Sequence, residues 1–421
     1  MNAPAGVRAA ALPPLALYVH FPWCVSKCPY CDFNSHAVRD GVPEARYVAA
    51  LLADLENEIV AGETLQQRRR EVVSVFLGGG TPSLFAPESI GALLEGARRL
   101  LPFAPGAEVT LEANPGTIER GRFSGYAAAG VNRVSLGAQT FDAAALRRLG
   151  RIHAPDDTRR AAAELHAAGL VNFNLDLMYG LPGQSVAQAI ADVEAALALQ
   201  PAHLSQYQLT LEPGTPLAAQ PPTDLPVDED VDLMLDESLA RLAAAGFARY
   251  EVSAHAREGR RCRHNLNYWR FGDYLGIGAG AHGKLTALAA AGGGVEFAGG
   301  GRAPRPVVTA TPLTIARSVR LREPRRYLGQ SPAAVTRAEV TPAQRPFEFM
   351  LNALRLLDGV ERELYERHTG LALEALAPAL ERLVVRGLLL DPAVGRLGPT
   401  AAGLCFLNDL LVEFLPGETG T

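Results

Sequence analysis

Residues 15–33 read LALYVHFPWCVSKCPYCDF, and this stretch decides the fold. It begins with a short apolar run, typical of a buried β-strand, which is followed by Pro22. Three cysteines then come in quick succession, Cys24, Cys28 and Cys31, with the spacing C-x3-C-x2-C. The stretch therefore predicts a buried strand whose following loop carries three neighbouring thiols.

Outward from this stretch, short apolar runs alternate with longer amphipathic ones. The predicted strands are 15–20, 72–77, 107–111, 133–136, 173–178 and 203–209. The predicted helices between and after them are 48–59, 87–101, 117–129, 156–168 and 185–199. Six βα units in a row predict an α/β fold in which a parallel sheet with right-handed crossovers curls into a partial, TIM-like (β/α)6 barrel.

Polar residues or glycines follow each predicted strand at its carboxyl end, which is where active sites lie in such folds. After the cysteine loop of the first strand, they are Gly79, Gly80 and Thr81, then Glu112, Gln139, Asp176 and Thr210. Six such coincidences in register predict one shared pocket.

Three thiolates suit three corners of a cubane [4Fe–4S] cluster and leave the fourth iron open to an outside ligand. That arrangement is what reductive cleavage of S-adenosylmethionine (SAM) needs, because the amino and carboxylate groups of SAM chelate the open iron. The alternative is a structural zinc ion with His20 or His36 as fourth ligand, although zinc sites favour paired C-x2-C units. Cys262 and Cys405 stand alone in the sequence.

The rest of the chain divides into four segments. Residues 1–14 are predicted to be a disordered tail, 15–283 the barrel with its closing segment, and 284–340 a Gly/Ala-rich excursion and linker helix. Residues 341–415 form a separate unit with helices predicted at 346–357, 373–386 and from 400 onward. A short hairpin of 388–390 with 396–397 completes the order of a winged-helix-like α+β domain.

Composition narrows the class of protein. The chain has 421 residues, 48% hydrophobic and 20% charged, with a net charge of -5 that argues against a broad nucleic-acid-binding surface. Five cysteines, three of them crowded together, do not resemble a secreted disulfide framework. With no apolar stretch of membrane-spanning length and no continuous signal sequence, we expect a cytoplasmic protein.

The motif at 18–33 resembles that of oxygen-independent coproporphyrinogen III oxidases and their radical SAM relatives. The similarity continues at 78–82, 112–115, 139, 151, 176–182 and 212–216, and so spans about 15–283. The C-terminal unit resembles the C-terminal domain of the same family. This resemblance implies a radical SAM barrel that holds a [4Fe–4S] cluster and SAM.

Two features bear on the subfamily. The oxidases carry a further cysteine two residues after the third, and here that position is Phe33. The sequence also contains His264-Asn265-Leu-Asn-Tyr268-Trp269, which is similar to the H-N-x-x-Y-W motif of HemW-type haem chaperones. The chain thus resembles proteins thought to bind haem and hand it to apo-haemoproteins. Some of these acceptors are expected to be membrane-bound and reached by peripheral contact.

The resemblance also assigns roles in the pocket. Gly79, Gly80 and Thr81 are expected to hold the methionine end of SAM. Arg151 offers a planar fork for its carboxylate, and Glu112 can accept from its amino group. The other residues expected to contact SAM are Gln139, Asp176, Tyr18, Tyr30 and Thr210.

For haem, iron favours an imidazole ligand and the macrocycle favours aromatic neighbours. His264, Asn265, Tyr268 and Trp269 are the first candidates, with Arg261 and Arg263 for the propionates and His282 as a second imidazole. The alternative is that His264 and Asn265 make buried hydrogen bonds while Trp269 packs in the core.

Three functions remain open on the sequence. The first is a haem chaperone with a SAM-bound cluster, whose acceptor is unknown. The second is a coproporphyrinogen III oxidase, which Phe33 disfavours. The third is another radical SAM enzyme such as an RNA modifier, against which the acidic balance counts.

Overall fold

The computed structural model describes residues 12–39, 41–61, 70–116, 121–288, 313–330 and 334–416. Six parallel strands form the centre of its main sheet, side by side in chain order. They are β1 (Leu15–Phe21), β4 (Val72–Gly79), β5 (Phe103–Ala113), β6 (Arg133–Gln139), β7 (Phe173–Tyr179) and β8 (His203–Gln208). The predicted partial barrel is therefore confirmed.

The sheet extends further than the sequence predicts. Beside β1 lies the parallel strand β11 (Asp273–Ile277), followed by the antiparallel strands β12 (His282–Leu288), β13 (Leu313–Arg320) and β14 (Val335–Glu339). At the other edge, β10 (Ala254–Ala256) and β9 (Ala248–Arg249) are antiparallel. Much of the segment 284–340, expected as an excursion and linker helix, thus continues the sheet. Its Gly/Ala-rich stretch 292–301 lies outside the described residues.

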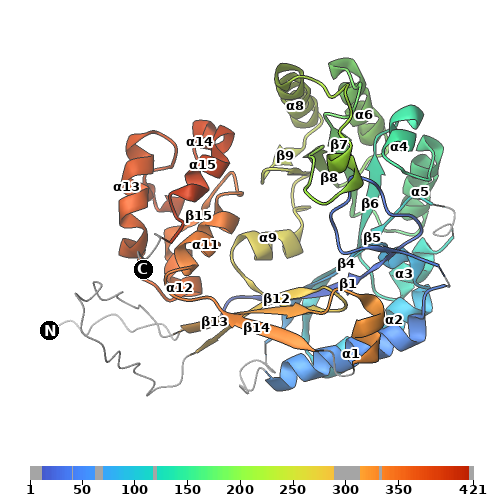
Figure 1. The fold of residues 1–421 in the computed structure, drawn as a ribbon, viewed down its shortest axis with the longest axis horizontal. Helices are drawn as coiled ribbons and strands as arrows, with labels where there is room; N and C mark the ends of the chain where they lie inside the picture. Colours follow the sequence, from blue (N-terminus) through green and yellow to red (C-terminus); the bar gives the residue numbers. More distant parts are fainter. Residues whose placement is uncertain are drawn as a thin grey trace.

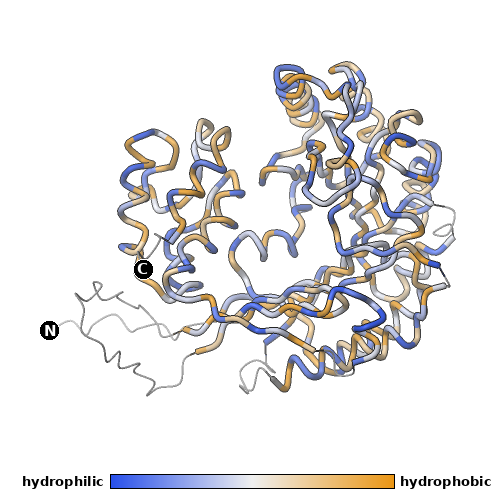
Figure 2. Tube along the Cα trace, in the orientation of Figure 1, coloured by the Kyte–Doolittle hydropathy of each residue, from blue (hydrophilic) through white to orange (hydrophobic). Residues whose placement is uncertain are grey.

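Helices cover the outer, convex face of the curled sheet (Figure 1). They include α1 (Glu44–Ala61), α2 (Pro87–Leu100), α3 (Phe123–Ala128), α5 (Pro155–Ala167), α6 (Val186–Ala198) and α8 (Asp228–Ala244). Hydrophobic and hydrophilic residues interleave along α1 and α2, as expected for helices with one buried face (Figure 2). The helix predicted at 117–129 is shorter, and 117–120 lie outside the described residues. The short helix α4 (Ala143–Arg148) was not predicted.

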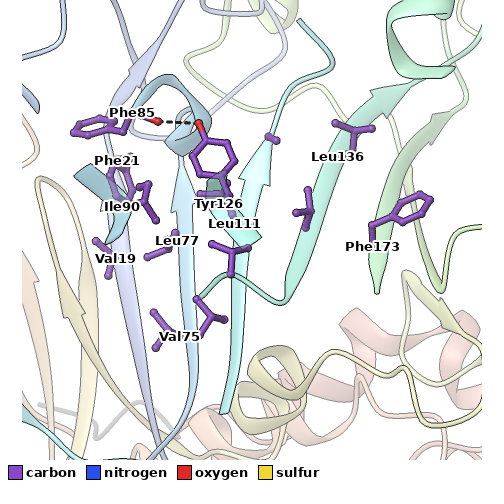
Figure 3. Packing of buried hydrophobic residues seen from close by; sticks show 14 of the residues in the cluster. Val19, Phe21, Val75, Leu77, Phe85, Ile90, Leu111, Tyr126, Leu136 and Phe173 are labelled. Carbon is purple, nitrogen blue, oxygen red and sulfur yellow. Dashed lines mark hydrogen bonds between the residues drawn. The ribbon is translucent and has the colours of Figure 1, made fainter. Parts of the chain in front are cut away.

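The period-2 geometry of the strands separates the core from the pocket. Along β1, Leu17, Val19 and Phe21 belong to the main core cluster under the helices. Figure 3 shows Val19 and Phe21 there with residues of the neighbouring strands and with Tyr126, whose hydroxyl donates to Phe85 O at 2.8 Å. The alternate residues therefore face the concave side, and in β5, β6 and β7 these residues are largely polar.

The C-terminal unit is a group of helices around short strand pairs (orange to red in Figure 1). It comprises α11 (Arg345–Ala353), β15 (Val360–Glu361), α12 (Arg362–Thr369), α13 (Ala377–Val385), β16 (Arg396–Leu397), α14 (Ala401–Cys405) and α15 (Leu407–Val412). Instead of the predicted hairpin of 388–390 with 396–397, β16 pairs with β15, while Leu389 bridges Pro399. The unit shares a hydrophobic core with Tyr250 and Phe271 of the segment that closes the barrel.

Two expectations concern the chain's ends and its longest apolar segments. Of the predicted tail 1–14, residues 1–11 lie outside the described residues, whereas Pro13 is buried and Pro14 O accepts from Asp273 N at 3.0 Å. Among the helices of the described ranges, we find none that is long and apolar enough to cross a membrane.

Candidate functional site

The cysteine loop leaves β1 at the carboxyl end of the sheet and is anchored at both of its ends. The short strands β2 (Trp23–Cys24) and β3 (His36–Ala37) pair in parallel and bracket the three cysteines. Asn34 fastens the loop to the rest of the sheet, because its Nδ2 donates to Ala279 O and Arg322 O, each at 2.9 Å. The loop is thus held in place by the backbone of this chain.

The three thiols Cys24, Cys28 and Cys31 are free, half-buried and line one cavity of about 370 Å³. Burial raises the pKa of the Cys24 and Cys31 thiols, because an apolar environment disfavours the thiolate. No three His, Cys, Asp or Glu side chains of the described residues converge on a point where they could hold a single metal ion. A cubane cluster needs no such convergence, because each thiolate binds a different iron.

Each sulfur also has a polar neighbour of its own. Thr81 Oγ1 donates to Cys24 Sγ at 3.4 Å, Arg151 Nη1 to Cys28 Sγ at 3.7 Å, and Ser35 Oγ lies 3.9 Å from Cys31 Sγ. Hydrogen bonds to cluster sulfurs are a usual means of stabilising thiolate charge and tuning the potential. The donor set therefore fits a [4Fe–4S] cluster with one open corner.

The zinc alternative loses its fourth ligand in this arrangement. His20 Nε2 donates to Asn34 O and His20 Nδ1 lies against the Tyr18 hydroxyl, both at 2.9 Å, so both ring nitrogens are occupied. His36 lines a different cavity, behind the loop.

Most of the predicted SAM residues line the same cavity as the cysteines. These are Tyr30, Gly79, Gly80, Glu112, Gln139, Arg151, Asp176 and Thr210. They come from the carboxyl ends of five strands and from adjoining loops, as the register argument predicts. Phe33 lines this cavity too and is 60% exposed.

Two predicted contacts lie elsewhere. Tyr18 lies deeper in the barrel than His20, and its ring packs against Phe76 and His264. Thr81 is 2% exposed, bonds to Cys24 and accepts from Asn114 Nδ2 at 2.8 Å. Neither lines the main cavity, so in this geometry Thr81 supports a cluster ligand, and both SAM contacts stay predictions.

The glycines after β4 are required by the protein itself as well as by any ligand. Gly79 has φ +110, and a Cβ there would collide with the His20 ring. A Cβ at Gly80 would lie 2.6 Å from Trp23 O. The backbone of this turn therefore packs directly on the root of the cysteine loop.

Backbone strain marks the end of β6. Gln139 has φ 66, a left-handed conformation that residues other than glycine seldom adopt, and the β6–β7 register shifts between Gly137 and Gln139. This irregularity turns the Gln139 side chain toward the cavity. Such strain is typical of binding sites.

The carboxyl groups of Glu112 and Asp176 lie in the floor of the cavity. Burial raises the pKa of Glu112 to about 7, with Gly79 N–H donating to Oε2 at 2.9 Å and opposing the shift, while Asp176 adds to it. Burial likewise raises the pKa of Asp176, which accepts from Ser135 Oγ and Asn174 Nδ2. Glu112 is thus poised between its neutral and ionised forms near neutral pH.

This shift predicts a pH-dependent affinity for SAM. If Glu112 accepts from the amino group, binding requires the carboxylate, so affinity should rise roughly tenfold between pH 6 and pH 8. Calorimetric titration of the cluster-loaded protein with SAM at several pH values checks this. In Glu112→Gln, the part of the pH dependence that comes from Glu112 should disappear. In the ligand-free protein, Glu112's contribution to stability is present below its ordinary pKa of 4.5 and is lost as the pH rises through about 7. If SAM affinity depends on pH in the same way in the parent protein and in Glu112→Gln, Glu112 does not bind the amino group of SAM.

The motif at 264–269 lies at the opposite end of the barrel. It forms α9 (Arg263–Trp269), where His264 is 8% exposed and its Nδ1 lies 3.2 Å from Ser74 Oγ, near the start of β4. Burial lowers the pKa of His264 to about 3. The rings of Tyr18 and Phe76 lie against it in tilted arrangements, with ring centres 6.4 and 5.0 Å away, on the side toward the cysteine loop. His264 is therefore a buried, neutral imidazole in the barrel floor.

The other residues singled out in the motif, Asn265, Tyr268 and Trp269, are half-buried. The Tyr268 ring centre lies 5.2 Å from that of Tyr274. Trp269 packs on the C-terminal core under the Arg355 guanidinium, 4.5 Å from its ring centre. Their haem contacts stay predictions.

Two arginines and the second imidazole complete the predicted haem set. Arg261 pairs with Asp358 at 3.1 Å, and Arg263 donates to Gly106 O at 2.9 Å. His282 is exposed at the start of β12, outside the main cavity. Partial desolvation by its surroundings, together with the nearby Arg317, lowers its pKa. Haem ligation by His282 likewise stays a prediction.

Sequence reasoning missed several residues that line the cavity. Asn114 lies two residues after Glu112, and its Oδ1 accepts from Arg151 Nη2 at 2.5 Å. Tyr207 is 44% exposed, although the first four residues of its strand, β8, are buried. Ser135 and Gly137 alternate along β6 on the cavity side. These residues could have been predicted from the sequence. Because side chains alternate between the two faces of a strand, every second residue before Gln139 and Asp176 faces the cavity.

Known proteins resemble this chain over both of its parts. Residues 18–196 match the radical SAM superfamily, and residues 340–406 match the HemN C-terminal domain. The heme chaperone HemW of Escherichia coli is 45% identical, over 96% of this chain and 99% of that protein. The heme chaperone HemW of Haemophilus influenzae is 43% identical, over 97% and 99%. The structure of coproporphyrinogen III oxidase (HemN) from E. coli, a radical SAM enzyme, has a TM-score of 0.73 at 22% identity, over 96% of this chain and 90% of that one; this likeness concerns the fold.

Proposed function

The chain belongs to the HemW family of radical SAM proteins, and from that premise we propose that it binds haem and hands it to apo-haemoproteins. The observation that carries the proposal is 45% identity to a heme chaperone over 96% of this chain, with both family regions in place. The acceptors would be apo-haemoproteins, and free ligand thiols favour a reducing, cytoplasmic location.

We propose that Cys24, Cys28 and Cys31 hold the cluster while the cavity residues hold SAM. Arg151 would fix the SAM carboxylate, Glu112 its amino group, and Gln139 and Asp176 its ribose. Bound there, the cluster and SAM would supply one-electron chemistry. Around them the protein's own contribution is to anchor the loop through Asn34, neutralise sulfur charge through Arg151 and exclude water with the aromatic ring of Tyr30.

The second candidate is a coproporphyrinogen III oxidase, which the fold of HemN favours. Against it stands Phe33, whose phenyl ring cannot ligate a metal at a position where the oxidases carry cysteine. The exposed ring of Phe33 at the cavity leaves three thiols in the loop and no fourth.

Haem titration of anaerobically prepared, cluster-loaded protein tests the proposal against the alternative. The chaperone reading predicts about one equivalent of bound haem with a sharp Soret band. The same preparation, given SAM, a reductant and coproporphyrinogen III, should leave the porphyrinogen unchanged. Conversion at about one turnover per minute or faster, without haem binding, would support the oxidase instead.

A further inference from the structure

A series of hydrogen bonds leads from the floor of the cysteine-lined cavity into the interior of the barrel. Asp176 lines the cavity, and behind it lie the buried side chains of Asn174 on β7 and His203 on β8. The series ends at Tyr250, a buried residue of the hydrophobic core that the C-terminal unit shares with the barrel's closing segment. We call Asp176, Asn174, His203 and Tyr250 the interior network.

The two carboxylate oxygens of Asp176 are each held by one donor. Asn174 Nδ2 donates to Oδ1 at 2.8 Å, and Ser135 Oγ donates to Oδ2 at 3.0 Å. Asn174 Nδ2 also donates to Ser135 Oγ at 2.7 Å, so one amide group fixes both donors. Because a carboxylate oxygen can accept about two hydrogen bonds, each oxygen keeps capacity for a ligand in the cavity.

The orientation of the Asn174 amide determines the direction of the remaining bonds. Since its Nδ2 faces the carboxylate, its Oδ1 faces the other way and must accept. It accepts from His203 Nδ1 at 2.7 Å and from Ser205 Oγ at 3.0 Å. The reversed amide would place its oxygen against the Asp176 carboxylate, and two acceptors in contact repel each other. The donor at His203 therefore keeps Asn174 in the orientation that Asp176 needs.

A donor at His203 Nδ1 requires an acceptor at Nε2. Burial, together with the nearby Arg133, lowers the pKa of His203 well below its ordinary value, so the imidazole is neutral and carries a single N–H. Nε2 lies 2.9 Å from the Tyr250 hydroxyl, whose oxygen accepts from Cys262 N at 3.3 Å. The hydroxyl hydrogen is thus free to be donated to Nε2. Tyr250 thereby selects the tautomer of His203 that donates to Asn174.

Tyr250 connects the interior network to the C-terminal unit. It shares its hydrophobic core with Phe349 and Met350 of α11, and its carbonyl oxygen accepts from Leu357 N at 3.2 Å. Its ring meets the His203 ring edge to face, with the ring centres 5.6 Å apart. Neither ring lines the cavity, so both reach a bound ligand only through other residues.

From these contacts we infer that His203 is a positioning residue for Asp176 in the SAM site. Tyr250 holds it in the donating tautomer, and it acts on the carboxylate through Asn174. The inference rests on the proposed function, because it takes Asp176 to bind a ribose hydroxyl of SAM. A carboxylate that is already oriented by two donors binds that hydroxyl without the entropic cost of ordering itself first. The C-terminal unit then contributes to SAM binding without touching the ligand.

Calorimetric titration of the cluster-loaded full chain with SAM, and with deoxy analogues of SAM that each lack one ribose hydroxyl, tests the inference. The parent protein should bind SAM roughly tenfold more tightly than at least one analogue, because the missing hydroxyl leaves Asp176 without its ligand partner. In His203→Phe, which keeps a ring but removes the donor, this preference should fall below about threefold. His203→Asn should restore the preference, because its Nδ2 can stand where the imidazole Nδ1 stood.

Two further variants separate positioning from general damage to the fold. Tyr250→Phe removes only the hydroxyl and should reduce the same preference, though less than His203→Phe does, because the donor of His203 remains. His255 is also a buried imidazole, but it pairs with Leu204 across β10 and β8 and so lies on the opposite face of the sheet from His203. His255→Phe should therefore keep the preference of the parent protein. Iron analysis verifies that each variant carries the cluster.

The outcomes keep the inference apart from the proposed function. A parent protein that binds no SAM, or that binds SAM and both analogues equally, overturns the assignment of Asp176 and the inference with it. If Asp176→Ala loses the preference while His203→Phe and Tyr250→Phe keep it, Asp176 stays in the SAM site and the role of His203 is overturned. An equal loss of affinity for SAM and for the analogues in His203→Phe shows general damage and likewise overturns that role. If His203→Phe takes up no cluster, Tyr250→Phe decides by the same readings.

Discussion

Replacing Cys24, Cys28 or Cys31 by serine is expected to abolish the iron–sulfur cluster. The reason is that a serine hydroxyl does not ionise near neutral pH, so a cubane held by three thiolates would lose a third of its protein ligands. Anaerobic reconstitution followed by iron and sulfide analysis is the measurement, with about four of each expected in the parent protein.

Two cysteines of the same chain serve as controls for this experiment. Cys405 is exposed, and Cys262 is 3% exposed, with its Sγ against Glu108 Oε1. Serine at either position should leave the iron content unchanged. Stoichiometric zinc without sulfide in the parent protein would contradict the cluster.

Arg151→Ala is expected to weaken SAM binding by about 2–3 kcal/mol, or roughly a hundredfold, through loss of a charge-assisted contact to the carboxylate. The guanidinium is preorganised for this role, because Nη2 donates to Asn114 Oδ1 and to Gly137 O while Nη1 faces Cys28. Calorimetry on protein of verified iron content measures the change.

Arg148→Ala is the matched control for Arg151→Ala. Arg148 lies three residues earlier and pairs with Asp224 at 2.7 Å, with its side chain 45% exposed and outside the cavity. Its removal should leave the Kd for SAM within twofold of the parent value, since exposed ion pairs contribute little. An unchanged Kd in Arg151→Ala would remove Arg151 from the SAM site.

The barrel could be predicted from sequence because its signals are local. Each central strand is an apolar run, and the polar residue after it marks the carboxyl end of the sheet. The sequence did not predict that β12, β13 and β14 extend the sheet. A strand such as β13, LTIARSVR at 313–320, has no continuous apolar run, and it pairs with a strand that lies far from it in the sequence. The partner of such a strand cannot be identified from the sequence pattern of the strand itself.

The sequence predicted at which end of the strands the site lies, but not how deep in the barrel each side chain lies. Tyr18 and His20 share one face of β1, yet His20 lies near the glycine turn and Tyr18 lies one layer below, beside His264. Linear spacing gives the face of a strand, whereas the depth depends on the curvature of the whole sheet. The same limit explains why the sequence left open whether the motif at 264–269 is buried, whereas in the fold His264 is 8% exposed.

Delivery of haem to an acceptor is tested most directly by the rate of transfer. Haem-loaded protein is mixed with candidate apo-haemoproteins, and the Soret band of each acceptor is followed against passive loss of haem to apomyoglobin. A chaperone should load at least one acceptor faster than haem dissociates passively, because direct transfer within a complex bypasses release into water. Transfer that never exceeds the passive rate for any acceptor, in a preparation that instead converts coproporphyrinogen III, would contradict the account.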